Sequence, residues 1–243
     1  MPAARIPLSR IELAIREVCN CLGDKRGCSS AWESMNEKDL WRELVACILG
    51  SRVRFEVAHS AMDRMDEAGL FARAPDIRRS VCYEQDVLRA LSGHNDAHDG
   101  RTNAKGYPFS KVRSKQIRAA AESLYSNGSD IRSLLDKARH VREARRHLAT
   151  DVAGLGPKQA SLFLRNIGYA AHVAVLDVHV LTYMAWAGLT PSPVTTVRTI
   201  RQYEMLEDAF IEHSCSSGFP PDRFDLAVWV VVRVVKREHK LCR

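Results

Sequence analysis

The sequence lacks a hydrophobic stretch long enough to cross a membrane, and its first ten residues, MPAARIPLSR, contain no apolar signal core. We therefore expect a cytoplasmic chain, associated with the nucleoid and not with a membrane. The cysteines predict no zinc site, because Cys19, Cys21 and Cys28 follow a C-x-C-x6-C spacing with no histidine nearby. Their odd total of seven also argues against a disulfide framework. We expect free thiols in a reducing compartment, with no metal and no other cofactor.

The chain has fewer acidic than basic residues: 29 Asp and Glu compared with 36 Lys and Arg. Its formal net charge is +7 and its pI is near 9.2. A modest basic excess favours polyanionic partners but is also common in soluble proteins. The distribution of charge is more informative. Cations fall in three separate segments of helical pattern, RSKQIRAAAESL, KARHVREARRHL and VVRVVKREHK. This spacing indicates a folded basic surface and not a disordered tail.

Helical periodicity dominates the chain. Apolar side chains repeat at three- and four-residue spacing over residues 8–22, and similar patterns predict helices over about 38–50, 53–67, 84–92, 111–126, 130–137, 141–149, 158–168, 178–187, 200–214 and 222–239. The run AVWVVVRVV is rich in β-branched residues and would also fit a buried strand. A polar stripe formed by Arg233, Arg237 and Lys240, with a helix start at Pro221, favours a helix there. The predicted fold class is all-α.

One long polar segment, SGHNDAHDGRTNAKGYPF, interrupts this pattern over residues 92–109. Loops of this length are uncommon unless they are functional or disordered. His94, Asp96, His98 and Asp99 resemble metal ligands in type, but no apolar frame fixes their geometry, so a solvated loop is the better interpretation. A contact with a ligand or with the DNA backbone is its more plausible active role.

The stretch VREARRHLATDVAGLGPKQASLFLRNIG, residues 141–168, has the pattern of two helices joined by a tight turn. Gly154 and Gly156 permit a close backbone turn before the second helix. In such a helix-hairpin-helix, backbone N–H groups at the start of the second helix form a seat for a phosphate without reading sequence. An ordinary αα-hairpin with a glycine cap fits the same pattern equally well.

Lys158 and Asp177 are the two residues of this region whose positions suit a catalytic role. A lysine in the first turn of a helix opposes the macrodipole by about 0.3–1 kcal/mol, and this field favours the neutral amine that can attack an electrophilic carbon and form a Schiff base. Asp177 follows the apolar run VAVL and precedes HVLTYMAW, which predicts the N-cap of a helix. A capping carboxylate is also held ionised, so it is suited to stabilising a sugar cation.

GLGPKQAS, followed by LDVHV, resembles the helix-hairpin-helix and Gly/Pro/Asp signature of base-excision DNA glycosylases, in particular the lysine-bearing, bifunctional 8-oxoguanine DNA glycosylases. RELVACILGSRVRFEVAHSAMDRM, KGYPFSKVRSKQIRAAAES and FDLAVWVVV are similar to further helices of that superfamily. KQASLFLRNIGYA is the most specific piece and is similar to the archaeal-type second branch. The resemblance implies two helical lobes with the hairpin at the cleft between them: 38–168 as the central lobe, and 1–37 plus 169–243 as the second.

The resemblance also implies an activity: excision of an oxidised purine, 8-oxoguanine, from double-stranded DNA by a monomeric enzyme, with nicking of the abasic strand through a lysine Schiff base. Lys158 matches the catalytic lysine, Asp177 the catalytic aspartate and His179 the histidine of the D-x-H element. The implied DNA-binding residues are Gly154, Gly156, Gln159, Arg52, Lys111, Arg113 and Lys115, and the implied base-pocket residues are Trp229, Phe109 and Tyr107. Trp229 would also fit a plain core position, and Arg52 an exposed cation at a helix start.

The chain departs from the family pattern at several positions. Pro157 replaces the residue that usually precedes the lysine, and Arg52 stands where many members carry a glutamine that fills the space left by the flipped base. The iron–sulfur cluster of endonuclease III relatives is absent, since after Cys82 only Cys215 and Cys242 remain. Two alternatives stay open: a glycosylase of this fold for another modified base, for example in phage defence, and a non-catalytic helix-hairpin-helix DNA-binding protein. The second would have no reason to pair a lysine with Asp177.

Overall fold

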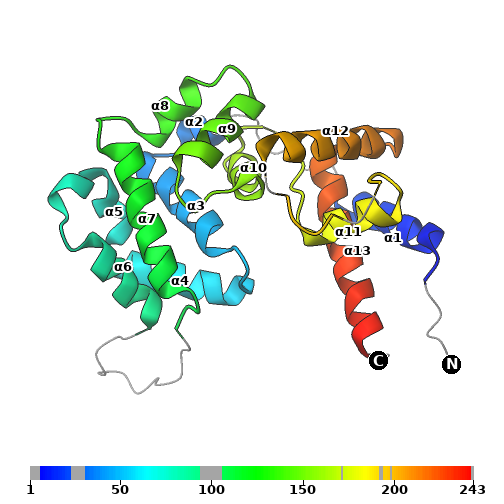
Figure 1. Cartoon of the computed structure of the whole chain (residues 1–243), viewed down its shortest axis with the longest axis horizontal. Helices are drawn as coiled ribbons and strands as arrows, with labels where there is room; N and C mark the ends of the chain where they lie inside the picture. Colours follow the sequence, from blue (N-terminus) through cyan, green and yellow to red (C-terminus); the bar gives the residue numbers. More distant parts are fainter. Residues whose placement is uncertain are drawn as a thin grey trace. The chain divides into compact units, whose positions relative to one another are not determined.

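The computed structural model describes residues 6–22, 31–93, 106–170, 172–191, 194–197 and 199–241, with side chains up to residue 237. These residues form helices and connecting turns with no strand among them, which confirms the predicted all-α fold. They divide into two units, which we call the continuous unit, residues 30–169, and the two-segment unit, residues 1–29 with 170–243 (Figure 1).

The continuous unit is built around α3, Glu37–Leu49, which packs against α4, α5, α7, α8 and α10. Asn36 caps α3 by accepting a hydrogen bond from the Asp39 N–H at 2.9 Å, and Leu40, Leu44 and Ile48 on its inner face are fully buried. The surrounding helices are α2 Ala31–Ser34, α4 Phe55–Glu67, α5 Leu70–Arg73, η1 Ala74–Arg79, α6 Tyr83–Ser92, α7 Ser110–Tyr125, α8 Ile131–Asp136, α9 Val141–Asp151 and α10 Pro157–Asn166. α3 therefore supplies the central core surface on which the hairpin of α9 and α10 is mounted.

The start of the continuous unit lies before the boundary at residue 38 that the sequence suggested. The Arg132 guanidinium donates hydrogen bonds to the backbone carbonyls of Trp32 and Met35 and lies 5.6 Å from the Trp32 ring centroid. The Trp32 ring also packs against Tyr169, with centroids 5.4 Å apart. These contacts attach α2 to the continuous unit, although its four residues are too few to show a periodic pattern in the sequence.

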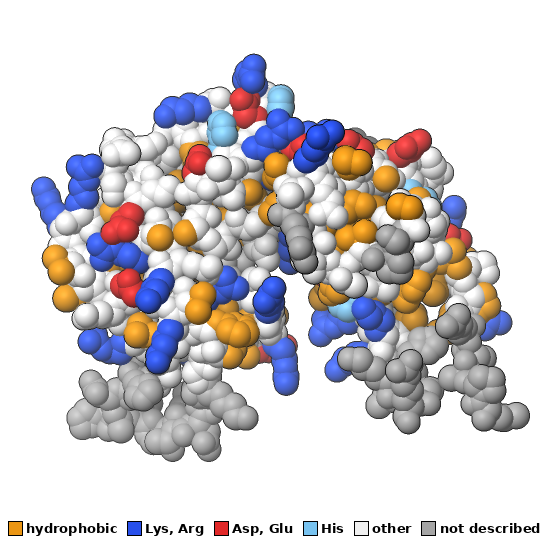
Figure 2. Space-filling model, in the orientation of Figure 1, with side chains coloured by type: hydrophobic (Ala, Val, Ile, Leu, Met, Phe, Trp, Pro, Cys, Tyr) orange, Lys and Arg blue, Asp and Glu red, His pale blue; other side chains and the backbone are white. Residues whose placement is uncertain are grey.

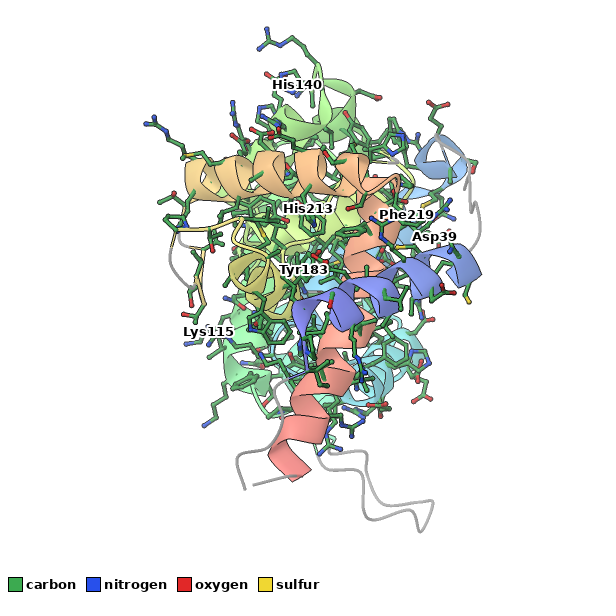
Figure 3. All side chains as sticks on the ribbon, turned by 90° about the vertical axis from the view of Figure 1, so that its right-hand side faces the viewer. Asp39, Lys115, His140, Tyr183, His213 and Phe219 are labelled. Atoms are coloured by element: carbon green, nitrogen blue, oxygen red, sulfur yellow. The ribbon has the colours of Figure 1, made fainter. Side chains whose placement is uncertain are left out.

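The two-segment unit joins the N-terminal helix to the end of the chain. It contains α1 Leu8–Leu22, α11 Val178–Trp186, α12 Ile200–Ser216 and α13 Pro221–Leu241. α1 and α11 pack on α13, where Val228 and Val232 are fully buried. The rings of Tyr183, His213 and Phe224 pack together in this unit, with a 2.8 Å hydrogen bond between the Tyr183 hydroxyl and His213 Nε2. Tyr183 and His213 are labelled in Figure 3.

The structure decides between strand and helix for AVWVVVRVV, because this run lies inside α13. Val228, Val231, Val232 and Val235 are buried where α13 packs against α1 and α11, whereas Val234 is 54% exposed, so the burial of one helix face overrides the strand propensity of the run. Among the described residues, no helix is both long and apolar enough to cross a membrane. The short elements α5 and η1, like α2, were not predicted from the sequence.

Candidate active site

The hairpin between α9 and α10 requires glycine at its tightest point. Gly154 has a φ of +87°, in the left-handed region that favours glycine. A Cβ at this position would lie 3.2 Å from Gln116 Oε1 and 3.2 Å from Ile48 Cγ2. The backbone therefore turns directly against α3 and α7, and only a residue without a side chain fits there.

Gly156 serves a different purpose as the N-cap of α10. Its backbone is extended, with φ −90° and ψ 177°, so any residue could adopt it. A Cβ would meet only Gln159 Oε1, at 3.5 Å, which is ordinary contact. Glycine is among the residues preferred at a helix N-cap, and without a side chain it leaves the N-terminus of α10 uncovered at this position.

The first turn of α10 contains Pro157, Lys158 and Gln159. The first N–H groups of a helix have no acceptor within it, and proline at the first position removes one of them. The backbone N–H groups of Lys158 and Gln159 thus point outward at the positive end of the helix, where an anion binds well. Both side chains are half-buried.

The helix α10, which carries Lys158, packs on α3, which carries Cys47. Burial strongly raises the pKa of the Cys47 thiol, the neighbouring Glu43 carboxylate raises it further, and the charges of Lys158 and Arg165 partly lower it. Glu43 Oε1 accepts a hydrogen bond from Asn166 Nδ2 at 2.8 Å, which links α3 to the end of α10. Lys158 is half-buried and its charge acts on a thiol of the core.

Three segments of the continuous unit meet beside the hairpin. The Tyr107 hydroxyl donates to the Leu49 carbonyl at 2.7 Å, at the end of α3. Arg113 donates to the Ser51 carbonyl at 3.3 Å and to Gln116 Oε1 at 2.7 Å. Since Gln116 also borders Gly154, one network joins the hairpin, the start of α7 and the α3–α4 turn.

Arg52 lies in the α3–α4 turn, exposed, with a φ of +66°. It is the one non-glycine residue with positive φ in the described part of the chain. Such backbone strain occurs preferentially at functional sites. Arg52 lies two residues before Arg54, the N-cap of α4, which begins at Phe55.

The remaining predicted residues of this unit differ in exposure. Lys111 and Lys115 are exposed on α7, and Lys115 is labelled in Figure 3. Phe109 is 42% exposed, whereas Tyr107 is only 3% exposed and packs in the core. The predicted stacking role of Tyr107 does not agree with this burial, because its hydroxyl satisfies the carbonyl at the end of α3. In the view of Figure 2, basic and hydrophobic side chains alternate over the lower part of this unit.

Asp177 caps α11 in the two-segment unit, as its position in the sequence predicted. One of its carboxylate oxygens, Oδ1, accepts hydrogen bonds from the N–H groups of His179 at 2.8 Å and Val180 at 2.9 Å. The preceding strand-like run is anchored by Tyr203, whose hydroxyl accepts from the Leu176 N–H at 3.1 Å and donates to the Ala174 carbonyl at 2.9 Å. The aspartate is thus half-buried and held in position by the cap.

His179 and Trp229 lie next to this cap. Their rings are edge-to-face with centroids 6.4 Å apart, and the Arg233 guanidinium lies 4.8 Å from the Trp229 ring centroid. Burial lowers the pKa of His179; Asp177 opposes this, while the charges of Lys236 and Arg233 lower the pKa further. The histidine is therefore neutral at pH 7.

Arg233 and Lys236 were not among the predicted site residues. With Trp229 they follow an i, i+4, i+7 spacing on α13, a signal that the sequence already contained. Lys236 Nζ donates to Thr182 Oγ1 on α11 at 3.3 Å. Trp229 is half-buried and not a plain core residue, and of these two cations Arg233 lies over its ring.

No metal centre is apparent in the part of the chain that the structure describes, because no three His, Cys, Asp or Glu side chains are placed to hold an ion. Cys19, Cys21, Cys47, Cys82 and Cys215 are free thiols. Most of the 92–109 segment, including His94, Asp96, His98 and Asp99, lies outside the described residues.

The chain is similar in sequence to known proteins over most of its length. The chain is 29% identical over 195 residues to an 8-oxoguanine DNA glycosylase/AP lyase of Sulfurisphaera tokodaii, covering 79% of this chain and 82% of the relative. A Korarchaeum cryptofilum protein of the same name is 24% identical, with 81% of each chain covered.

Solved structures share the fold. The 8-oxoguanine DNA glycosylase of Thermotoga maritima has a TM-score of 0.66 at 23% identity, covering 93% of this chain and 95% of that one. The Methanocaldococcus jannaschii 8-oxoguanine glycosylase/lyase, solved in complex with a 15mer DNA containing 8-oxoguanine, has a TM-score of 0.67 at 20% identity, covering 90% and 95%. The sequence profile of the 8-oxoguanine DNA glycosylase family matches residues 88–218, more than half of this chain, and the chain therefore belongs to that family.

Proposed function

We propose that this protein is a bifunctional DNA glycosylase/AP lyase that excises 8-oxoguanine from double-stranded DNA. The observation that carries the proposal is the place of Lys158: a half-buried lysine on the first turn of α10, directly after a glycine turn that leaves backbone N–H groups open to a phosphate. Relatives with 79–81% coverage of this chain carry the same activity in their names. Its substrate agrees with a cytoplasmic, nucleoid-associated location.

The first chemical step is departure of the base. The damaged nucleotide is rotated out of the stack, at a cost of a few kcal/mol. The bond between C1′ and the base nitrogen breaks with its electron pair leaving on the base, so positive charge develops on the sugar. The Asp177 carboxylate stabilises that charge, and its second oxygen, Oδ2, can face the sugar while Oδ1 caps α11.

The second step is covalent. The neutral Lys158 amine attacks C1′, and after proton loss and ring opening the adduct becomes an imine. The imine acidifies C2′, so loss of a C2′ proton and cleavage of the C3′–O bond release the 3′ phosphate by β-elimination. His179, neutral beside Asp177, is available to accept a proton in this sequence.

The extruded base stacks on aromatic side chains in the proposed pocket. Trp229 and Phe109 are both accessible, and stacking contributes about 1–3 kcal/mol per base. Arg233 covers one face of Trp229, so a base takes the other face or displaces the guanidinium. Tyr107 is a structural support for this region and does not stack on the base.

The DNA backbone is held by the hairpin and by basic side chains. Gly154 shapes the turn, and Gly156, Lys158 and Gln159 present the phosphate seat. Lys111 and Lys115 neutralise nearby phosphates, while Arg113 positions the α3–α4 turn through Ser51. These contacts fix the protein on the duplex without reading its sequence.

Borohydride trapping tests the proposal. Reducing the imine during reaction with 8-oxoguanine or abasic duplex should link the protein covalently to DNA, and Lys158→Gln should abolish this product while duplex binding is retained. Lys137→Gln, which removes an exposed lysine of the same unit outside the hairpin, is the matched control and should trap normally. An adduct that survives Lys158→Gln would assign the nucleophile elsewhere.

A further inference from the structure

Phe55 is exposed beside the α3–α4 turn, and no step of the proposed reaction uses it. Its side chain is 77% exposed at the first position of α4. The inner face of α4 is formed by Ala58, Ala61 and Met62, all buried, so Phe55 contributes nothing to the core. Single exposed apolar residues are common on protein surfaces, and exposure alone would carry no inference.

The ring of Phe55 is pre-oriented. It stacks on His59, one helical turn further on, with centroids 5.6 Å apart and planes inclined by only 11°. The His59 imidazole is itself held towards Asp63, at 3.9 Å. A ring that already stacks on a neighbour loses less conformational entropy than a free ring when a second flat group stacks on its other side.

The surroundings of Phe55 suit a nucleic acid. Arg52 and Arg54, both exposed, lie in the chain directly before it. The turn that carries them is tied through Ser51 and Arg113 to the same network as Gly154 of the hairpin. An aromatic ring flanked by cations is the usual combination for stacking on a base while neighbouring phosphates are neutralised.

We propose that Phe55 stacks on a base left without its partner when the damaged nucleotide is extruded. Extrusion breaks the stacking at that step of the duplex and exposes the flat face of the base on the opposite strand. The Phe55 ring, supported by His59, covers that face and stabilises the opened duplex. An intact duplex offers no such face, so Phe55 adds affinity only at a damaged or abasic position. This inference rests on the proposed action on DNA, but not on which base is removed.

A binding experiment with a duplex that the enzyme cannot cleave tests this role. The duplex carries a tetrahydrofuran abasic analogue with 2-aminopurine opposite it, and a second duplex carries 2-aminopurine beside the analogue in the same strand. The wild-type protein should quench the fluorescence of the opposite base, because stacking quenches 2-aminopurine. Phe55→Ala should remove this quenching and weaken binding to the abasic duplex about tenfold, with binding to intact duplex unchanged. Phe55→Tyr should behave as the wild type.

Val81→Ala is the control, since Val81 is an 85% exposed apolar residue of the same unit, and it should change neither signal. The inference is overturned if Phe55→Ala quenches normally, if only the same-strand probe responds, or if abasic and intact duplexes lose affinity equally. Failure of excision by the wild-type protein would instead refute the proposed function, because this assay measures no excision.

Discussion

Replacing Gly156 by alanine separates the phosphate seat from the fold. A Cβ at Gly156 meets only Gln159 Oε1 at 3.5 Å, and the backbone conformation is open to any residue. Gly156→Ala should therefore melt within about 1 °C of the wild type, as expected for a change that disturbs no contact. The same methyl group would occupy the space where a phosphate approaches the N-terminus of α10.

The loss of DNA affinity can be estimated. Hydrogen bonds from backbone N–H groups to a charged acceptor contribute about 1.5–3 kcal/mol, so losing one weakens binding by about 10- to 150-fold. Because the contact reads neither sequence nor damage, intact and 8-oxoguanine duplexes should lose affinity by similar factors. Fluorescence anisotropy with both duplexes measures this.

Two control variants sharpen the result. Gly154→Ala places a side chain on a left-handed backbone and against Gln116 and Ile48, so it should cost about 1–2 kcal/mol and lower Tm by about 2–8 °C. Lys115→Gln removes a cation, so it should reduce the salt dependence of binding by about one counterion, whereas Gly156→Ala should leave that slope unchanged. If Gly156→Ala weakened binding to damaged DNA alone, the hairpin would be part of the lesion pocket and the reasoning about the phosphate seat would be refuted.

The remaining predictions concern Asp177 and the histidines. Asp177→Asn keeps the cap of α11 but removes the negative charge. Excision of the base should therefore fall about 100- to 1000-fold, while nicking of a preformed abasic site should fall far less. Equal losses in the two assays would mean that the aspartate acts on Lys158 instead. Folding lowers the pKa of His179 and of His213, mainly by burial, so below pH 6.5 the unfolded chain binds more protons than the folded one. The free energy of unfolding should hold above pH 6.5 and fall as the pH drops below it. In thermal melts from pH 7.5 to 5, His179→Gln should lose less stability than the wild type. An identical loss in the two proteins would contradict the burial of the His179 imidazole.

Local chemistry made much of this protein predictable. Asp177 was expected at an N-cap because it follows an apolar run and precedes a helical one, and the structure confirms the cap. Gly154 and Gly156 were expected at a turn, and helical spacing located α13 despite its β-branched composition. Each of these inferences depends on neighbours within one or two turns, which a sequence displays directly.

What could not be predicted depends on contacts between distant segments. Tyr107 was placed in the base pocket because it lies in an aromatic, glycine-containing stretch. In the structure its hydroxyl donates a hydrogen bond to the Leu49 carbonyl, and the ring lies in the core. The proximity of Trp229, Arg233 and His179 depends on how α13 packs against α11. The left-handed backbone of Arg52 likewise depends on the surrounding network, since arginine has no preference for that conformation.

The division of the two-segment unit between the two ends of the chain affects the order in which the units can fold during translation. All of the continuous unit has been synthesised before α11 begins, so its core around α3 can close first. α1, in contrast, has the apolar side chains of Ile11, Ile15 and Cys19 ready long before the buried face of α13 exists to receive them. The apolar side chains of this segment therefore lack their packing partner on α13 through most of translation, and an isolated helix of 15 residues is only marginally stable in water. The unit that carries Lys158 is complete at a stage when the unit that carries Asp177 cannot yet fold.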